Sequence, residues 1–476
     1  MSTLTPPLVG AAAPADRVLA GAHRRLAPVP RWWRDVTGAL GWGVLLVVTA
    51  LWVAGGGVQD LGSLSGLLTS TGRLTGLVAS ALLLIQVLLM ARVPWVEQAW
   101  GQDELARSHR LVGLTSFSLM VAHIVLITLG YAAGTPRGVW GTAWDLVVTY
   151  PGMLLATAGT AALVMVVVTS LRRARRRLRY ESWHLIHLYG YLGAGLALPH
   201  QLWTGAQFLD SPAATVFWWG LWGATAAAVL VFRVATPLWR SLRRPLHVLD
   251  VRSEGPGVTT VTVGGPGVHR LPGRAGQFFQ WRFLDGEGWS RANPYSLSAA
   301  PDGRTLRLTA AHVGDGSARL ATLRPGTRVL VEGPYGRLHG GVRSRRKVLL
   351  MGSGIGITPM RALLEELPQR PGDVTVVHRV RSRHDAVLGE ELSALAQTRG
   401  ARYVQVEGHR VEGRPSWLPA QAGHLTDTEA LLELVPDVAD HDVYLCGADA
   451  WMEAARAAAL EAGVPRDAVH LERFTS

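Results

Sequence analysis

Long apolar segments alternate with short arginine-rich segments through the first half of the chain. Each apolar segment is close to the roughly 20 residues that an α-helix needs to cross the hydrocarbon core of a bilayer. The pattern therefore predicts an all-α bundle of six transmembrane helices, followed by a different architecture. The predicted spans cover residues 38–57, 73–91, 110–131, 147–171, 183–203 and 214–236.

Arginines mark alternate loops of this predicted bundle. They precede the first span and follow the second, fourth and sixth, whereas the other loops hold little more than Arg73 and Arg137. Because cytoplasmic loops carry the excess of positive charge, we expect a multi-pass protein of the cell membrane with both termini in the cytoplasm. Residues 1–34 are rich in Ala and Pro and are predicted to form a disordered cytoplasmic tail. Flanking arginines of this kind account for the net charge of +12 without a nucleic-acid partner.

Two of the predicted spans carry paired histidines. His109 and His123 belong to the third span, and His187 and His200 to the fifth. Ionisable side chains at membrane depth are costly and are usually functional and partnered. The separations along each helix correspond to rises of about 21 and 20 Å, so His109/His187 and His123/His200 match in depth. Since neutral imidazoles ligate heme iron and facing helices can hold such cofactors, we predict two b-type hemes.

The two helices differ in how well they present their histidines. Fourteen residues return a helix to nearly the same face, whereas thirteen leave His187 and His200 about 140° apart in an ideal helix. Pro199 offers a cause for a local distortion. His184, one turn before His187, remains an alternative inner ligand or a neighbour of a heme propionate. For any one of these histidines alone, an ordinary core or pore-lining role is the better interpretation, and it is the matched pairs that favour ligands.

After Pro245 the pattern changes to short alternating strands separated by Gly and Pro turns. Six such strands predict a small antiparallel β-barrel, and from Lys347 onward strands alternate with helices, as in an open α/β sheet. We therefore expect a helical domain over residues 35–240, a barrel over 245–340 and an α/β domain over 341–476. The strands expected are 247–251, 259–263, 277–283, 295–298, 306–311 and 328–332, then 348–350, 374–380, 401–406 and 443–445.

A glycine-rich loop, GSGIGITP, begins at Gly352 where the first α/β strand ends. Glycines there let a dinucleotide pyrophosphate approach the backbone and the following helix N-terminus, although a plain glycine turn is an alternative. Two weaker motifs lie upstream, NPYSLS and HVGDGSARL. In them Tyr295 could stack on a flavin ring, and Gly316 with Ser317 could hold phosphates. The plainer alternative is a strand-end tyrosine followed by a turn.

Two arginines follow the second α/β strand, where the adenosine ribose of a dinucleotide commonly lies. Arg381 and Arg383 suit a ribose phosphate, because arginine is always charged and can bond bidentately. They predict a preference for NADPH over NADH, with a solvated basic loop as the alternative. The only cysteine is Cys446, which excludes a disulfide within the chain and a cysteine-ligated iron–sulfur cluster.

Together these motifs resemble the ferric reductase and NADPH oxidase superfamily of transmembrane flavocytochromes b, over roughly residues 38–476. The resemblance implies a six-helix heme domain with two bis-histidine hemes, an FAD-binding barrel of the ferredoxin–NADP reductase type and an NAD(P)-binding α/β domain. The flavin motif of the family matches Asn293, Pro294, Tyr295 and Ser296, with Asn293 in place of the more usual histidine, and Arg291 is a candidate flavin-phosphate contact. The flavin pyrophosphate turn matches Gly316 and Ser317.

The resemblance also assigns residues around the nicotinamide. The nucleotide loop of the family matches Gly352, Gly354, Gly356, Thr358 and Pro359, and the family's nicotinamide borders Cys446 and Gly447. Glu472 and Phe474 match a terminal acid and an aromatic residue that covers the flavin. Tyr295, Cys446 and Phe474 are thus the residues implied nearest the redox chemistry.

The function implied is electron transfer from cytoplasmic NADPH or NADH, through FAD and two hemes, to an acceptor outside. Ferric iron is the first candidate acceptor, dioxygen giving superoxide is the second, and a periplasmic redox protein is the third. A membrane receptor or transporter without enzymatic activity is disfavoured by the nucleotide motifs. The predicted outer loops, residues 58–72, 132–146 and 204–213, are too short for a substrate domain.

Overall fold

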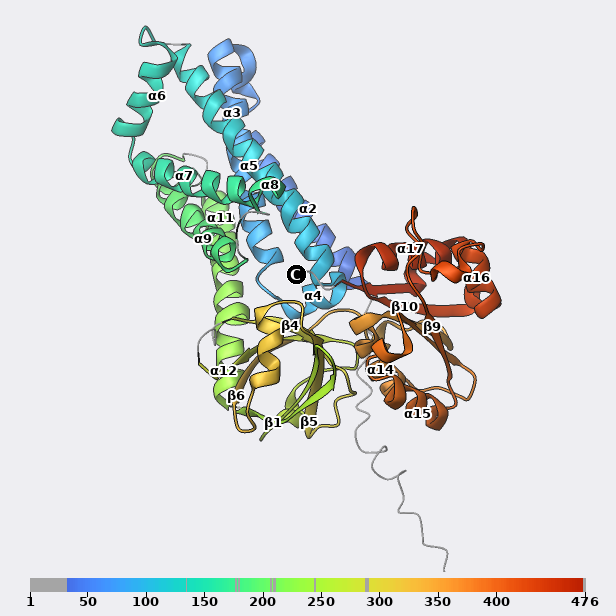
Figure 1. Ribbon diagram of the computed structural model, residues 1–476. Helices are drawn as coiled ribbons and strands as arrows, with labels where there is room; N and C mark the ends of the chain where they lie inside the picture. The colour runs from blue at the N-terminus through green and yellow to red at the C-terminus, as the bar shows by residue number, and fades with distance from the viewer. Residues whose placement is uncertain are drawn as a thin grey trace, which may run out of the picture. The chain divides into compact units, whose positions relative to one another are not determined.

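The computed structural model describes residues 32–133, 135–175, 178, 180–205, 208, 211–243, 245–286 and 291–473 (Figure 1). These residues form two compact units, which divide the chain between Pro237 and Leu238. The tail predicted over residues 1–34 lies outside the described residues except at its end. There the prediction is wrong, because helix α2 (Trp32–Ala54) already begins at Trp32. Arg34 anchors this first turn: its guanidinium lies 4.5 Å from the ring centre of Trp100.

The first unit, called here the helical unit, contains one long helix for each predicted span. Five helical segments are long and apolar enough to cross a membrane. Helix α9 is not among them, because its 24 residues include three histidines and Gln201. A helix lies at each predicted span, but the prediction of six membrane spans is supported for five. The helices are α2, α3 (Leu64–Leu89), α5 (Gln102–Ala132), α7 (Met153–Ser170), α9 (Tyr180–Trp203) and α11 (Pro212–Ala228), joined by η1 (Gln59–Gly62), α4 (Pro94–Trp100), α6 (Gly138–Thr149) and α8 (Arg172–Arg175).

The last long helix changes its hydrogen-bond pattern on the way out of the bundle. Helix α11 continues into a π-helical segment, η2 (Val229–Ala235), and then into α12 (Thr236–Arg243). In the π-helical segment the bonds run over five residues, as in the bond from the Thr236 N–H to the Val231 carbonyl. Such a segment shifts the side chains around the axis relative to a continuous α-helix and is often found at functional sites.

Small residues let two pairs of helices approach closely. At Gly72 of α3, an added Cβ would lie 3.1 Å from the backbone nitrogen of Ile127 in α5. At Gly159 of α7, it would lie 2.8 Å from the Gly193 carbonyl oxygen in α9. Packing through glycines is typical of helices that associate in a bilayer. The pairs α3/α5 and α7/α9 therefore form the framework of the helical unit.

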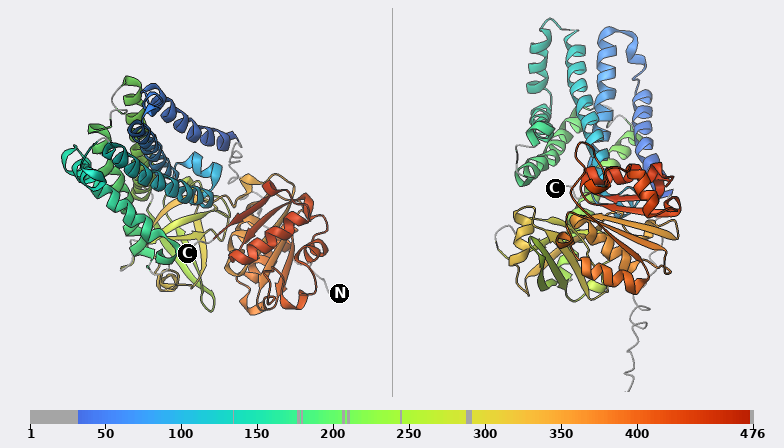
Figure 2. Two further views of the ribbon diagram at one scale, coloured as in Figure 1. Left: turned by 90° about the horizontal axis from the view of Figure 1, so that it is seen from above. Right: turned by 45° about the vertical axis from the view of Figure 1, so that its right-hand side comes forward.

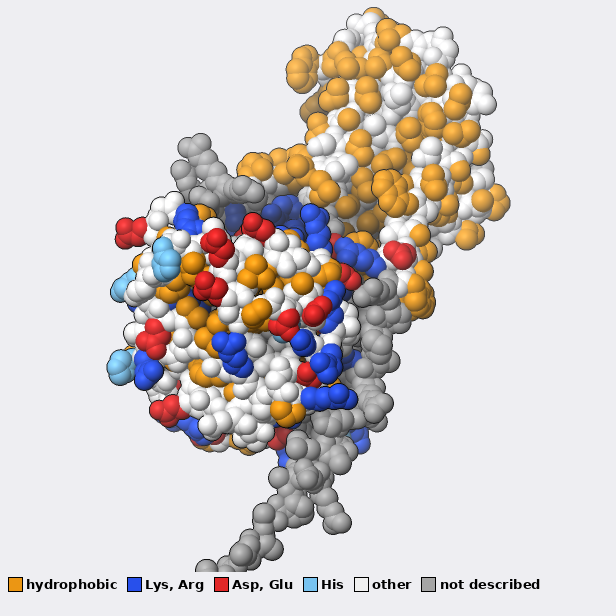
Figure 3. Space-filling model, turned by 90° about the vertical axis from the view of Figure 1, so that its right-hand side faces the viewer, with side chains coloured by type: hydrophobic (Ala, Val, Ile, Leu, Met, Phe, Trp, Pro, Cys, Tyr) orange, Lys and Arg blue, Asp and Glu red, His pale blue; other side chains and the backbone are white. Residues whose placement is uncertain are grey.

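The surface of the helical unit is apolar. On the face shown in Figure 3, hydrophobic side chains cover most of this unit, whereas acidic and basic side chains are interspersed over the other unit. Large side chains such as Trp42, Leu154 and Val216 are 65–73% exposed. A water-soluble protein rarely exposes so much contiguous apolar surface, so the helical unit is suited to lipid.

The second unit begins with a six-stranded antiparallel sheet in the order β4-β3-β6-β1-β2-β5. The prediction of a closed barrel is wrong: within the described chain, the end strands β4 and β5 share only the bridge between Leu297 and Leu308. Strand β4 is four residues long and includes Pro294, which has no N–H to extend a ladder. The strands are β1 (Leu246–Gly255), β2 (Val258–Gly264), β3 (Phe278–Phe283), β4 (Asn293–Ser296), β5 (Thr305–Ala311) and β6 (Arg328–Tyr335).

A five-stranded parallel sheet follows, in the order β11-β10-β7-β8-β9. Helices pack on its two faces, each over its own buried apolar core (Figure 2). Strand β11 was not predicted, because it has only four residues and three of them are partly exposed. The elements are β7 (Lys347–Ser353), α14 (Ile357–Glu366), β8 (Val374–Val380), α15 (Gly389–Arg399), β9 (Arg402–Glu407), α16 (Asp427–Leu434), β10 (His441–Cys446), α17 (Asp449–Glu461) and β11 (Val469–Glu472).

Polar contacts hold the two sheets of this unit together. The Glu365 carboxylate of α14 accepts a hydrogen bond from the Ala300 N–H at 2.7 Å. Glu391 of α15 lies 2.9 Å from Arg307 of β5 and 2.7 Å from Arg361. The antiparallel sheet is therefore fixed to the side of the parallel sheet that carries α14 and α15.

Candidate functional site

Two pairs of histidine rings face each other between α5 and α9. The ring centres of His109 and His187 are 5.9 Å apart, and those of His123 and His200 are 6.2 Å apart. Two imidazoles on opposite sides of one metal ion place their ring centres about 6 Å apart, since the metal–nitrogen bond is about 2 Å and the nitrogen lies about 1 Å from the ring centre. Both pairs have the spacing of a bis-imidazole ligand set.

The second nitrogen of each ring is held by a hydrogen bond. A histidine that ligates a metal commonly donates its other ring N–H to an oxygen atom, which fixes the tautomer. Among the described residues, none bonds the Nε2 atom of any of the four rings. The Nδ1 atoms of His109 and His123 lie 3.0 Å from the Gln86 carbonyl and 2.7 Å from the Gly72 carbonyl, and those of His187 and His200 lie 3.3 Å from Ser170 Oγ and 2.8 Å from Thr204 Oγ1.

These partners determine where the ring protons lie. A carbonyl can only accept, so Nδ1 of His109 and His123 carries the proton. The hydroxyls of Ser170 and Thr204 already donate to the carbonyls of Val166 and His200, so they too accept from Nδ1. Four Nε2 lone pairs are left to bind metal, and the donor set fits two heme irons.

Thirteen residues separate His187 and His200 in α9, which would leave the two on different faces of an ideal helix. The departure from this ideal geometry lies close to Pro199. The helix continues through this proline, which cannot donate to the preceding turn. The turn at Gly152 closes against the same segment: an added Cβ there would lie 2.7 Å from the His200 nitrogen. His200 thus reaches His123. His184 remains one turn away from His187, and it is the His187 ring that faces His109.

The flavin motif predicted from the sequence is assembled on β4 and the turn after β5. An added Cβ at Gly316 would lie 2.7 Å from Asn293 Oδ1, so these two residues are adjacent. Ser296 Oγ is buried and has no hydrogen-bond partner in the described chain. A buried hydroxyl normally has a partner, and a bound group would supply one here. Ser317 Oγ instead accepts from the Val313 and Gly314 N–H groups, so its hydroxyl shapes the turn.

Tyr295 lies beside this unsatisfied hydroxyl. Its backbone carbonyl accepts from the Trp281 indole at 3.0 Å, and burial raises the pKa of its phenol well above the usual range, so the ring is neutral. Arg291 is exposed at the start of the same segment. The residues fit a flat, polar-edged group such as a flavin, with an aromatic ring at its side.

The glycine loop lies at the carboxyl end of the parallel sheet, as predicted. β7 ends at Ser353, and the loop leads through η6 (Gly354–Gly356) into α14. An added Cβ at Gly356 would lie 2.2 Å from the Cys446 carbonyl oxygen, and one at Gly352 would lie 2.7 Å from the Ile357 Cα. Thr358 and Pro359 are buried in the first turn of α14. Glycines therefore permit the close approach of loop, helix and β10.

Cys446 and Glu472 meet at this edge on neighbouring strands, and Gly447 follows. Cys446 is fully buried, and burial together with the Glu472 carboxylate raises the pKa of its thiol well above the usual range. The thiol is thus neutral and not a nucleophile. Phe474, predicted to cover the flavin, lies outside the described residues.

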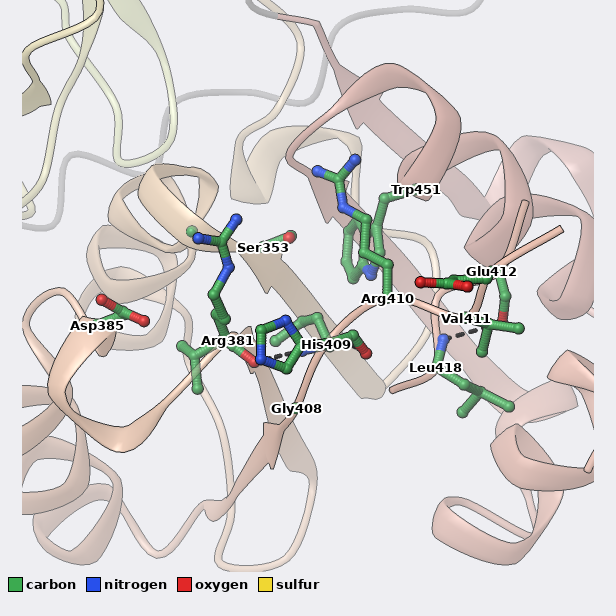
Figure 4. Close-up of a pocket in the computed structure, with 14 residues that line it drawn as sticks. Ser353, Arg381, Asp385, Gly408, His409, Arg410, Val411, Glu412, Leu418 and Trp451 are labelled. Atoms are coloured by element: carbon green, nitrogen blue, oxygen red, sulfur yellow. Dashed lines mark hydrogen bonds between the residues drawn. The ribbon is translucent and has the colours of Figure 1, made fainter. Parts of the chain in front are cut away.

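A cavity of about 560 Å³ opens at the carboxyl ends of β7, β8 and β9 (Figure 4). Arg381 and Arg410 line it on opposite sides, and the Trp451 ring lies beside Arg410. The lining residues are Ser353, Gly354, Arg379, Val380, Arg381, Asp385, Gly408, His409, Arg410, Val411, Glu412, Ser416, Leu418 and Trp451.

The two arginines predicted to bind a ribose phosphate have different surroundings. Arg381 lines the cavity. Arg383 does not: its side chain is 84% exposed and lies 3.5 Å from Glu407. Arg410, which the sequence analysis did not single out, lines the cavity instead, because β9 lies beside β8 and ends at the same edge. Its only sequence signal is a basic residue three positions after the end of β9.

Arg379 also lines the cavity. Its side chain is buried, and it donates to the His409 carbonyl at 3.1 Å. Burial and the charge of Arg410 lower the pKa of this guanidinium, but arginine remains charged in proteins. The cavity therefore combines three cationic groups with an aromatic face, which suits an anionic nucleotide.

Comparisons with known proteins match the two units separately. Residues 75–198 match the family described as ferric reductase like transmembrane component, and residues 350–457 match the oxidoreductase NAD-binding domain. The chain is 32% identical over 191 residues to ferredoxin–NADP reductase B of Sorangium cellulosum, a match covering 38% of this chain and 77% of that protein. It is 33% identical over 219 residues to the ferredoxin–NAD(+) reductase component of an alkene monooxygenase system of Xanthobacter autotrophicus, covering 45% of this chain and 64% of that protein.

Among solved structures, a ferredoxin NADP+ reductase from Neisseria gonorrhoeae with bound FAD and NADP aligns with a TM-score of 0.40 at 22% identity, over 48% of this chain and 98% of that one. The fold and the matched domains define a membrane-embedded, NAD(P)H-dependent oxidoreductase of the flavoprotein type. The chain belongs to the ferric reductase and NADPH oxidase superfamily, in which a ferric reductase-like transmembrane component precedes a ferredoxin–NADP reductase-like module.

Proposed function

We propose that this protein transfers electrons across a membrane, from cytoplasmic NADPH or NADH through FAD and two b-type hemes to ferric iron on the other side. When bound, FAD accepts a hydride from the nicotinamide and passes single electrons to the hemes. One NAD(P)H reduces two ferric ions and yields NAD(P)+ and one proton. The observation that carries the proposal is the set of two histidine pairs, each at bis-imidazole spacing and each with both Nδ1 atoms occupied.

In this proposal, the residues of the helical unit bind and orient the two hemes. His109 and His187 would ligate the inner heme, and His123 and His200 the outer heme, through their Nε2 atoms. The Gln86 and Gly72 carbonyls of α3 orient two of the rings. No proton transfer is required of the histidines, because both ring nitrogens of each would be engaged.

The residues of the second unit bind and orient the electron donor. Ser296 and Asn293 would bond polar edges of FAD, and Tyr295 would flank its ring. The glycine loop would bring the nucleotide pyrophosphate against the backbone at Gly354 and Gly356. Arg381 and Arg410 would bind the ribose phosphate of NADPH, which gives a preference for NADPH over NADH.

The direction of transfer depends on the orientation in the membrane. Arginines precede the first span and follow the second, fourth and sixth predicted spans, which supports cytoplasmic termini and a cytoplasmic nucleotide site. The inner histidine pair would then lie near the cytoplasmic face, because His109 follows the short arginine-containing segment after α4. Electrons would leave from the outer pair.

The acceptor is tested by stopped-flow absorbance. The purified protein, reduced by NADPH under anaerobic conditions, would be mixed with a ferric chelate or with air-saturated buffer. We expect ferric chelate to reoxidise the hemes faster than dioxygen does, with two ferric ions reduced for each NADPH consumed. Faster reoxidation by dioxygen, with superoxide formed, would favour an oxidase instead. Slow reoxidation by both would point to a periplasmic redox protein as the acceptor.

A further inference from the structure

One arginine of the helical unit lies at the inner histidine pair and has no part in the function described so far. Arg233 belongs to the π-helical segment η2, within the helical stretch Pro212–Arg243 that is apolar enough to cross a membrane. A charged side chain within such a stretch is costly and is a candidate functional group. Its Nη1 donates to the Met90 carbonyl, at the end of α3, over 2.8 Å.

The hydrogen bond to Met90 fixes the depth of this guanidinium. Gln86, whose carbonyl orients His109, precedes Met90 by four residues on the same helix. Four residues of α-helix correspond to a rise of about 6 Å, so the guanidinium and the His109 ring lie about one turn apart along α3. Consistent with this placement, the charge of Arg233 acts electrostatically on both His109 and His187.

The π-helical backbone of η2 suits the placement of the Arg233 side chain beside the inner histidine pair. The wider π-helical turn alters which face each side chain occupies, and Phe232 beside Arg233 is fixed edge-on against Trp95 at 5.4 Å. Only one of the five guanidinium donors is used by a described residue. The other donors are therefore available to an oxygen-bearing anion beside the inner pair.

The outer pair has a different cation near it. Arg73 follows Gly72, whose carbonyl orients His123, but its guanidinium is paired with Asp60 at 3.1 Å and its side chain is 44% exposed. Arg110 follows His109 directly in the sequence, and its side chain is exposed. The arginine on η2 thus distinguishes the inner site from the outer site.

We infer that Arg233 binds a propionate carboxylate of the inner heme and raises the reduction potential of that heme relative to a site without it. The inference rests on the proposed function, since it requires a heme between His109 and His187. Guanidinium binds carboxylate in a charge-assisted, often bidentate geometry, and a nearby positive charge favours the addition of an electron.

Spectroelectrochemical titration of the full chain in detergent tests this inference, after pyridine hemochrome analysis has counted the hemes. The variants are Arg233→Met, Arg233→Gln, Arg233→Lys and, as matched control, Arg110→Gln. The same changes in a His123→Ala background assign the inner potential. We expect Arg233→Met and Arg233→Gln to lower the inner potential by about 60 mV or more, a tenfold change in the ratio of reduced to oxidised heme. Arg233→Lys and Arg110→Gln should cause much smaller shifts.

Loss of the inner heme alone in Arg233→Met would also support the inference. If that variant does not fold, Arg233→Gln, which keeps a donor for the Met90 carbonyl, decides the question. An unchanged inner potential with two hemes bound would overturn the inference and would leave a lipid phosphate as the anion bound by Arg233. Equal shifts at both hemes would overturn it as well. A wild-type protein without two hemes would instead contradict the proposed function.

Discussion

The ring of His123 packs directly against Gly76 of the neighbouring helix α3. A Cβ added to Gly76 would lie 2.5 Å from His123 Nδ1, the same atom that lies 2.7 Å from the Gly72 carbonyl. A side chain at position 76 would therefore push the ring away from its hydrogen-bond partner. The absence of a side chain at one residue of α3 sets the orientation of a predicted ligand on α5.

The substitution Gly76→Ala should accordingly remove or weaken the outer heme and leave the inner one. Gly220→Ala in α11 is the matched control, because nothing lies within 4 Å of its added Cβ. Pyridine hemochrome analysis should give close to one heme for the first variant and two for the second. Two tightly bound hemes in Gly76→Ala would mean that His123 is not held as a ligand in this way.

Removal of an outer ligand should have the same selective effect. His123→Ala or His200→Ala should each reduce the heme count from two to one, because the pairs at 5.9 and 6.2 Å are separate sites. His184→Ala is the control, since the His187 ring rather than that of His184 faces His109. The assignment of the outer pair would be refuted by two hemes in either variant, and that of the inner pair by one heme in the control.

The helices and most strands could be predicted because each has a local pattern. Apolar runs located the long helices, and alternation located β1 to β10 to within a few residues. The matching depths of His109/His187 and His123/His200 required only the helical rise. Each of these features depends on residues close together in the sequence.

Features that depend on contacts between distant segments could not be predicted. The open edge of the antiparallel sheet results from how far the short strand β4 reaches toward β5. Arg410 joins Arg381 only because β9 pairs with β8. The π-helical turn around Arg233 has no signal in its sequence, VLVFRVA, since a hydrogen-bond pattern rather than a residue type defines it.

The orientation in the membrane predicts a specific labelling pattern. With Cys446 replaced by serine, a cysteine at Thr135 should react with an impermeant maleimide in intact cells, whereas one at Ala174 should react only after lysis. The basis is the arginine content of the loop after the fourth predicted span. The reverse pattern would place the nucleotide site outside the cell and reverse the direction of electron flow.

The buried His378 predicts acid sensitivity of the second unit. Burial on β8 lowers its pKa from 6.5 to about 4, and its Nε2 has no partner within the described part of the chain. The unfolded chain therefore binds a proton at higher pH than the folded one. The contribution of the neutral ring to the free energy of unfolding is fully present above about pH 6.5. It is lost as the pH falls toward 4, and the loss is at most about 3 kcal/mol.

The variant His378→Asn should lose less stability between pH 7 and pH 5 than the wild type does, measured as urea midpoints in detergent. Asparagine can still form a hydrogen bond with the Tyr403 hydroxyl, which lies 3.0 Å from Nδ1 of the histidine ring. The exposed His424, replaced by glutamine, serves as control and should leave the wild-type pH dependence intact. Identical pH dependence in all three proteins would exclude His378 as the cause.

The nucleotide cavity predicts which arginines distinguish NADPH from NADH. Arg381→Ala and Arg410→Ala should each raise the KM for NADPH by about 10- to 100-fold, because a hydrogen bond to a charged group contributes about 1.5–3 kcal/mol. The KM for NADH, which lacks the phosphate, should change little. Arg383→Ala is the matched control: it lies in the same segment as Arg381, but its side chain is 84% exposed and faces Glu407, so it should leave both values nearly unchanged. Equal losses with both nucleotides, or a larger effect at Arg383 than at Arg410, would show that this cavity does not bind the ribose phosphate.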